Sequence, residues 1–268
     1  MSATVTSRDG TRISYDRIGS GPPVVLVDGA FCYRGFGPMP ALAKELAGRH
    51  TVFYFDRRGR GDSGDTAPYA VEREIEDVAA ICALTGEPPA LYGISSGAML
   101  ALRVAAAVPI RRLAIYEPPL QIDGTHVADP PDFRERIDAH LAAGRRGDAV
   151  KVFMKVVGVP GFGMVMMRLI PGVWRKLCAV VHTLPYDFAC IGDAQRGGPL
   201  PDELRRLLAA VPVPTRVLVG GKAAPWMKHA CEVVARLVPG AEHGVIPGQT
   251  HNVSAKAMAP ELELFFGG

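Results

Sequence analysis

Five short apolar runs, separated by segments with helical spacing, restrict the fold of this 268-residue chain more than any other feature. They are rich in β-branched and aliphatic residues and cover residues 23–27, 51–55, 90–93, 113–116 and 216–219. Strands that are buried on both faces have this composition, and parallel strands need a long crossover between them. The alternation therefore predicts an α/β fold with a mostly parallel sheet.

The two ends of the chain add three strands to this sheet. Residues 4–7 and 12–17, separated by an Asp-Gly turn, predict an antiparallel hairpin at one edge. Residues 242–247 predict a last short strand, and a helix is expected over residues 254–266. The expected architecture is an eight-stranded, mostly parallel sheet flanked by helices.

Residues 121–199 interrupt this rhythm. They show helical patterns, such as 133–143 and 148–157, and no convincing core strand. We therefore predict an inserted helical cap over residues 121–199, on a core domain formed by residues 1–120 and 200–268.

The pentapeptide Gly93–Gly97, which reads Gly-Ile-Ser-Ser-Gly, stands between a predicted strand and a helix-forming run. This context is typical of a nucleophile elbow, in which a serine occupies a sharp strand-to-helix turn. Gly93 and Gly97 allow the close backbone approach that the turn requires. The helix behind Ser95 also directs its first N–H groups toward negative charge that develops on an attacked carbonyl. Ser95 is thus the candidate nucleophile.

A serine hydroxyl needs a base to take its proton. Of the seven histidines, His251 lies in a turn after the last predicted strand and before the final helix. The competing interpretation is a surface or capping histidine, because Thr250, Asn252 and Ser254 could each start that helix. The order serine, acid, histidine along the chain favours His251 as the base.

The imidazole in turn needs an acceptor that fixes its tautomer. The loop 220–226, after the penultimate strand, contains no carboxylate. Glu117 directly follows the strand predicted at 113–116, at the sheet edge where Ser95 also lies. It could instead be a solvated residue before a proline turn, but the absence of a carboxylate from the loop 220–226 favours Glu117 as the acid.

An oxyanion hole needs two N–H donors. One is expected from Ser96, the residue after the nucleophile, and the other from Gly29 or Ala30, between which the sequence does not choose. Asp28 precedes them, and a carboxylate that pointed into the hole would oppose the oxyanion. We expect Asp28 to be turned away and held by hydrogen bonds.

Five residues are candidate contacts for a substrate: Asp28, Phe31, Met164, Trp174 and Trp226. Met164 lies in a cap segment rich in flexible side chains, and methionines fill irregular cores at least as often as they line pockets. Trp174 and Trp226 have the same two interpretations, core packing or contact with a ligand.

The charged segment 56–63, Asp-Arg-Arg-Gly-Arg-Gly-Asp-Ser, follows a predicted strand. A phosphate site is one interpretation, but the glycine patterns of phosphate-binding loops are missing. We expect a tight turn held by internal ion pairs.

Composition excludes several classes. The formal charge of +3 includes no concentrated basic run, so nucleic acid is not an expected partner. The first residues do not resemble a signal peptide, and no run approaches the roughly 18 apolar residues that span a bilayer, so a cytoplasmic location is expected. Five dispersed cysteines without a C-x-x-C pair predict buried, reduced thiols and no metal site. A homodimer is possible.

Together these motifs resemble the α/β-hydrolase superfamily over nearly the full length. The Asp-Gly oxyanion loop, the Gly-x-Ser-Ser-Gly-Ala elbow and a Glu after the following strand resemble the zearalenone-type lactone hydrolases in particular. The Ser-His-Glu triad of those enzymes matches Ser95, His251 and Glu117. One departure is Asp28, which stands where relatives of the superfamily usually carry a histidine.

These features predict a cofactor-independent serine hydrolase that cleaves a small apolar ester or lactone through an acyl-enzyme on Ser95. The alternatives are related acyl chemistry, by a thioesterase, acyltransferase or cyclase, and a ligand receptor that retains the pocket without turnover. Haloalkane dehalogenation and epoxide hydrolysis are disfavoured because both need a carboxylate at position 95.

Overall fold

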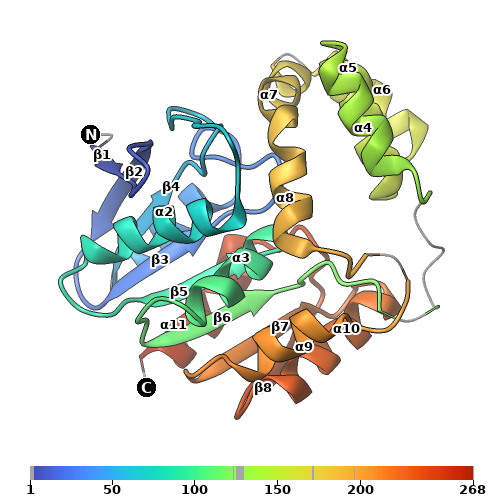
Figure 1. Ribbon diagram of the computed structural model, residues 1–268. Coiled ribbons are helices and arrows are strands. Elements are labelled where there is room, and N and C mark those ends of the chain that lie inside the picture. The colour runs from blue at the N-terminus through green and yellow to red at the C-terminus, as the bar shows by residue number, and fades with distance from the viewer. Residues whose placement is uncertain (1–2, 123, 125–129, 171, 196, 268) are drawn as a thin grey trace.

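A computed structural model describes residues 3–122, 124, 130–170, 172–195 and 197–267. Eight strands form one sheet in the order β1-β2-β4-β3-β5-β6-β7-β8 (Figure 1). They are β1 (Ala3–Thr6), β2 (Arg12–Gly19), β3 (Pro23–Val27), β4 (Thr51–Phe55), β5 (Ala90–Ile94), β6 (Arg112–Tyr116), β7 (Thr215–Gly220) and β8 (Glu242–Ile246). Strands β1, β2 and β4 pair antiparallel, and all other pairs are parallel. The predicted fold class is confirmed.

Helices cover both faces of the sheet. The core helices are α1 (Met39–Leu46), α2 (Val71–Ala83), α3 (Ser96–Ala105), α9 (Asp202–Ala209), α10 (Pro225–Leu237) and α11 (Ala255–Phe266). Along β3, Val24 and Leu26 pack with α1 and α11, whereas Val25 and Val27 pack with α2, α3, α9 and α10. Successive side chains of a strand point to opposite faces, and both faces are covered here. This is why the runs read as continuously apolar.

The described residues of the segment predicted as a cap form helices joined by turns, with no strand among them. The helices are α4 (Phe133–Ala142), α5 (Arg146–Val156), α6 (Gly161–Leu169), α7 (Val173–Val180), the 3-10 helix η1 (Val181–Thr183) and α8 (Leu184–Ile191). Residues 123, 125–129, 171 and 196 of the predicted cap lie outside the described residues. These helices share a third apolar cluster, which is separate from the two clusters of the sheet.

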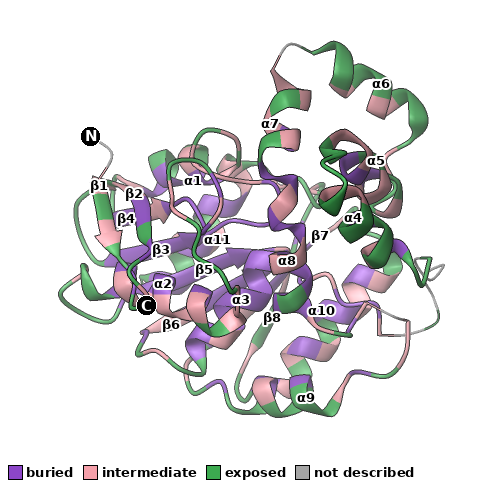
Figure 2. Cartoon of the chain, turned by 45° about the horizontal axis from the view of Figure 1, so that its top comes forward, coloured by how far each residue is buried: buried purple, intermediate pink, exposed green. Residues whose placement is uncertain are grey.

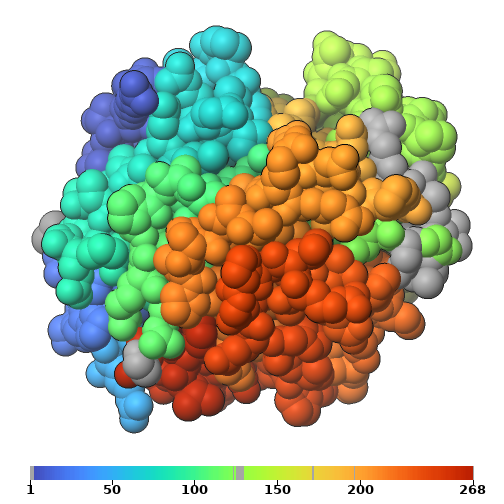
Figure 3. All heavy atoms as spheres, turned by 60° about the horizontal axis from the view of Figure 1, so that its bottom comes forward, coloured from blue at the N-terminus to red at the C-terminus, as the bar shows by residue number. Residues whose placement is uncertain are grey.

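Helix α8 joins this third cluster to the core. It runs from the group of cap helices down onto α3 (Figure 1). Phe188 belongs to the cap cluster, whereas Cys190 and Ile191 belong to the core cluster. Figure 3 shows the segment that follows α8, in orange, between the blue-to-green N-terminal half and the red C-terminal segment. By contrast, α6 contains no buried residue and lies at the exposed end of the cap (Figure 2).

Candidate active site

Three non-glycine residues have a positive φ among the described residues, and all three follow the carboxyl end of a parallel strand. They are Phe31 after β3 (φ 61°), Ser95 after β5 (φ 57°) and Glu117 after β6 (φ 47°). Such conformations cost about 1–3 kcal/mol each and persist where the surrounding structure imposes them, often at functional sites. Since β5 lies between β3 and β6, these residues share one edge of the sheet.

Ser95 occupies the turn between β5 and α3, with φ 57° and ψ −127°. Its N–H donates to the Tyr116 carbonyl at 2.9 Å. A side chain at Gly97 would place its Cβ 2.5 Å from the carbonyl oxygens of Val27 and Asp28. The glycine therefore lets α3 start directly against the loop after β3, and Ser95 is held at the tip of a tight turn.

Glu117 and His251 form a direct pair. The Nδ1 of His251 lies 2.6 Å from Oε2 of Glu117, and the Gly220 N–H donates to Oε1 at 2.8 Å. Glu117 is 1% exposed, whereas the His251 side chain is 46% exposed. A carboxylate only accepts hydrogen bonds, so Nδ1 carries the proton and Nε2 is left as the basic nitrogen. Glu117 is a buried acceptor rather than a solvated residue.

The turn that carries His251 is fastened to the sheet. The Tyr116 hydroxyl donates to the Thr250 carbonyl at 2.6 Å, and the Lys222 N–H donates to the Gln249 carbonyl at 2.8 Å. The end of β7 thus supplies a backbone contact to Glu117, and the loop after β7, which lacks a carboxylate, supplies one to the histidine turn.

Two cavities meet at Ser95. The first, of about 360 Å³, and the second, of about 350 Å³, are both lined by Ser95 and His251. Their other shared lining residues are Ala30, Phe153 and Val157. Each cavity is walled mainly by apolar side chains, and the first also reaches two glutamines and Lys222. The space beside the serine is suited to apolar groups on both sides of a reacting carbonyl.

The predicted substrate contacts are divided by the structure. Trp226 lines the first cavity and Phe31 lines the second. Met164 and Trp174 line neither and pack against the cap cluster, where the Arg168 guanidinium lies 5.5 Å from the Trp174 ring. Of the predicted oxyanion residues, Ser96 lines the first cavity, Gly29 the second and Ala30 both.

Asp28 differs from the expectation. Its side chain is 1% exposed and lines neither cavity, but Oδ1 has no hydrogen-bond partner among the described residues. The predicted hydrogen bonds are therefore wrong for this atom. Burial raises the pKa of Asp28 to about 7, and the charges of Arg60 and Arg57 only partly offset it.

The charged turn 56–63 also differs from the expectation, because its arginines pair outside the turn. Arg57 binds Glu74 of α2 and Asp187 of α8, Arg58 binds Asp77 and Asp9, and Arg60 binds Asp187. All three arginines are at most 1% exposed. These ion pairs join the turn to α2 and α8, and the sequence did not predict Asp187, which lies in a helix without a motif.

The remaining expectations concern absences, within the part of the chain that the structure describes. No group of three or more His, Cys, Asp or Glu side chains is arranged to hold a metal there. All five cysteines are free; Cys82, Cys190 and Cys231 are buried, and Cys32 and Cys178 are partly exposed. None of the described helices combines the length and the apolar character that crossing a membrane requires.

An eight-stranded α/β sheet that presents a serine on such a turn, with a histidine bonded to a strand-end carboxylate, defines the class of α/β hydrolases. The chain belongs to this class: the Alpha/beta hydrolase family matches residues 19–260.

Solved structures agree with this assignment. An alpha/beta hydrolase from Sphaerobacter thermophilus DSM 20745 is 47% identical, with a TM-score of 0.89, and the match covers 98% of this chain and 100% of that one. A hydrolase from Pseudomonas aeruginosa PA01 is 22% identical, with a TM-score of 0.75 and coverage of 100% and 98%. A thermophilic esterase from Thermogutta terrifontis is 24% identical, with a TM-score of 0.63 and coverage of 98% and 95%. The last two structures are less than 25% identical to this chain and show only that the fold is shared.

Proposed function

We propose that this chain is a serine hydrolase that cleaves a carboxylic ester or lactone through an acyl-enzyme on Ser95. The observation that carries the proposal is the 2.6 Å contact between His251 Nδ1 and the buried Glu117, at a point where two apolar cavities meet beside Ser95. Relatives in fold that are described as esterases support the same reaction class.

In the proposed reaction, Nε2 of His251 takes the Ser95 proton while Oγ attacks the substrate carbonyl. Glu117 stabilises the imidazolium and keeps the ring in the tautomer that presents Nε2. The N–H groups of Ser96 and of Ala30 or Gly29 bind the oxyanion. His251 then protonates the leaving oxygen, and a water deprotonated by the same nitrogen releases the acid. With a lactone, both products are parts of one hydroxy acid.

The exposure of His251 favours hydrolysis over acyl transfer. Nearly half of its side chain reaches solvent, so water has access to the base that must activate it. An acyltransferase or cyclase needs an acyl-enzyme that is shielded from water. The lactone form of the proposal rests on the resemblance of the Ser-His-Glu set to lactone hydrolases.

The test is covalent labelling with a fluorophosphonate, followed by peptide mass spectrometry. We expect one adduct on Ser95 in the wild type, none in Ser95→Ala, almost none in His251→Ala and a slower adduct in Glu117→Ala. His243→Ala, which changes an exposed histidine of β8, is the matched control and should label like the wild type. A folded wild type that does not label at Ser95 would refute the proposal and favour a ligand receptor. Labelled protein justifies screening esters and lactones of graded size.

A further inference from the structure

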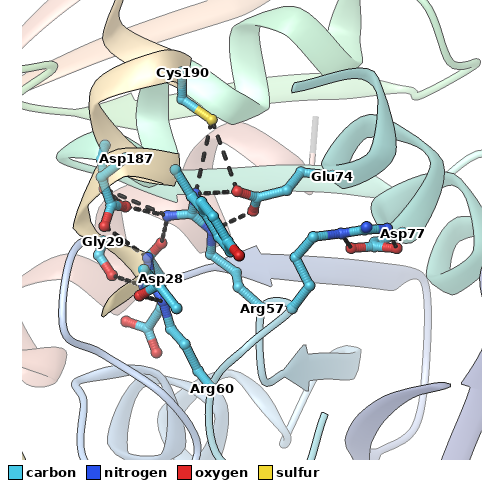
Figure 4. A network of polar contacts seen from close by, with 12 residues as sticks. Asp28, Gly29, Arg57, Arg60, Glu74, Asp77, Asp187 and Cys190 are labelled. Carbon is cyan, nitrogen blue, oxygen red and sulfur yellow. Dashed lines mark hydrogen bonds and ion pairs between the residues drawn. The ribbon is translucent and has the colours of Figure 1, made fainter. Parts of the chain in front are cut away.

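A buried ion cluster (Figure 4) contacts two residues of the predicted oxyanion hole, the Ser96 hydroxyl and the Gly29 carbonyl. We call it the arginine–aspartate cluster, formed by Arg57, Arg60 and Asp187. Their side chains are at most 2% exposed. Arg57 and Arg60 come from the turn after β4, whereas Asp187 comes from α8. Burying charges costs free energy unless they are paired and hydrogen-bonded, and all three charges of this cluster are paired.

Asp187 binds one side of the hole. Its Oδ1 accepts from the Ser96 hydroxyl at 2.7 Å and from Arg57 Nη1 at 2.7 Å, and its Oδ2 accepts from Arg60 Nη2 at 2.7 Å. Burial alone would raise the pKa of Asp187, but the two guanidinium groups and the hydroxyl hold it below its ordinary value. Ser96 is the first residue of α3, where the backbone N–H has no acceptor within the helix. The aspartate thus fixes the residue whose N–H is the first oxyanion donor.

Arg60 binds the other side. Its Nη1 donates to the Gly29 carbonyl at 2.7 Å. In a trans peptide the C=O and N–H point in opposite directions, so a Gly29 carbonyl held by Arg60 turns the Ala30 N–H away from the cluster. Ala30 and Ser95 line both cavities together. We therefore infer that the Ala30 N–H, which is turned away from the cluster, is directed toward the site. A cation at the carbonyl also polarises the peptide and strengthens its N–H as a donor.

We propose that Arg60 and Asp187 are positioning residues of the oxyanion hole, and that its two donors are the N–H groups of Ser96 and Ala30. The proposal rests on the proposed hydrolase function. Because Asp187 belongs to α8, the hole is complete only when this helix is docked on the core. The choice between Gly29 and Ala30, which the sequence leaves open, falls to Ala30.

The test uses variants that loosen the cluster by degrees. In Arg60→Lys, a single ammonium replaces a fork that reaches both Asp187 and the Gly29 carbonyl. Ser96→Ala removes the hydroxyl and keeps the N–H, so both arginines still pair with Asp187. Thr183→Val is the matched control, because it removes another bond to Arg60, from Nε to Oγ1 at 3.0 Å, and leaves the bonds of Arg60 to Asp187 and to the Gly29 carbonyl in place.

Two inhibitors separate positioning from simple loss of structure. A trifluoromethyl ketone forms a tetrahedral oxyanion with Ser95, whereas the matching methyl ketone remains largely planar. We expect Arg60→Lys to lower both kcat and the affinity for the trifluoromethyl ketone by about 10- to 100-fold. The effect should be smaller than the loss of a whole oxyanion donor, which lowers kcat by about 100- to 1,000-fold. Its KM and methyl ketone affinity should change by less than about 3-fold, because Arg60 lines neither cavity. Ser96→Ala should show the same pattern at about 3- to 10-fold, and Thr183→Val should match the wild type.

Two results would overturn the inference. If the trifluoromethyl ketone binds Arg60→Lys and Ser96→Ala as it binds the wild type, the cluster does not position the hole. If the affinities for both inhibitors, kcat and the melting temperature all fall together in these variants and in Thr183→Val, the cluster acts only on stability. A wild type that hydrolyses no ester and forms no adduct on Ser95 instead refutes the proposed function, and this inference with it.

Discussion

The buried carboxyl of Asp28 makes stability depend on pH in an unusual direction. In the unfolded chain this group loses its proton near its ordinary pKa of 3.8, whereas burial raises the pKa to about 7 in the folded protein. Between these values the folded state holds one more proton than the unfolded state. The free energy of unfolding that Asp28 contributes therefore falls as pH rises from about 4 to about 7 and stays low above that range.

Replacement by asparagine removes the ionisation and keeps the size. A difference of about 3 pKa units corresponds to about 4 kcal/mol, at 1.36 kcal/mol per unit. We expect Asp28→Asn and wild type to differ little at pH 4 because both side chains are then neutral. The variant should become more stable than the wild type by about 1.4 kcal/mol per pH unit, up to about 4 kcal/mol at pH 8.

The assay is urea unfolding of both proteins at five pH values from 4 to 8, with circular dichroism as the readout. Asp148→Asn is the control, since Lys151 lowers the pKa of this exposed carboxylate below its ordinary value, so the stability difference from the wild type should change little between pH 4 and pH 8. A stability difference for Asp28→Asn that does not grow between pH 4 and pH 7 would refute the reasoning. It would mean that Asp28 is already ionised in the folded protein at low pH.

Three further predictions concern the elbow and the acid. Ser95→Gly should raise the free energy of unfolding by about 1–2 kcal/mol, because glycine relieves the strain of the positive φ at this position, whereas Ser95→Ala should not. Equal urea midpoints for the two variants would contradict this. Glu117→Gln should lower kcat by about 1,000- to 10,000-fold in steady-state kinetics with little change in KM, and a loss below 10-fold would argue against its role. Gly97→Ala should cost at least about 2 kcal/mol in urea unfolding, because its Cβ meets two carbonyl oxygens, whereas Gly48→Ala meets nothing within 4 Å and serves as the control.

The strands and the elbow could be predicted from the sequence because both are written in local patterns. Runs of β-branched residues define strands over about five positions, and the glycines at 93 and 97 meet a steric need of a single turn. Glu117 could be proposed because parallel strands end at one edge, so a residue after β6 lies near a residue after β5.

The contacts of the charged turn could not be predicted in this way. Asp187 lies 127 residues from Arg60, in a helix whose sequence carries no motif, and only tertiary packing brings them together. The lack of a hydrogen-bond partner for Asp28 Oδ1 among the described residues likewise depends on tertiary packing rather than on its neighbours in sequence. Residue type also did not decide that Met164 and Trp174 pack within the cap while Trp226 faces a cavity.

The position of Glu117 at the end of β6 has a consequence for how this chain can change over evolution. The end of β7 contributes only the Gly220 amide to Glu117 of the proposed triad, while Lys222 and Ala223 of the following loop and Trp226 of α10 line the first cavity. Side chains in this loop can therefore vary without removing a group that performs chemistry. Substitutions there can reshape the first cavity for a new molecule while the contact between Glu117 and His251, on which the proposed reaction at Ser95 depends, is preserved.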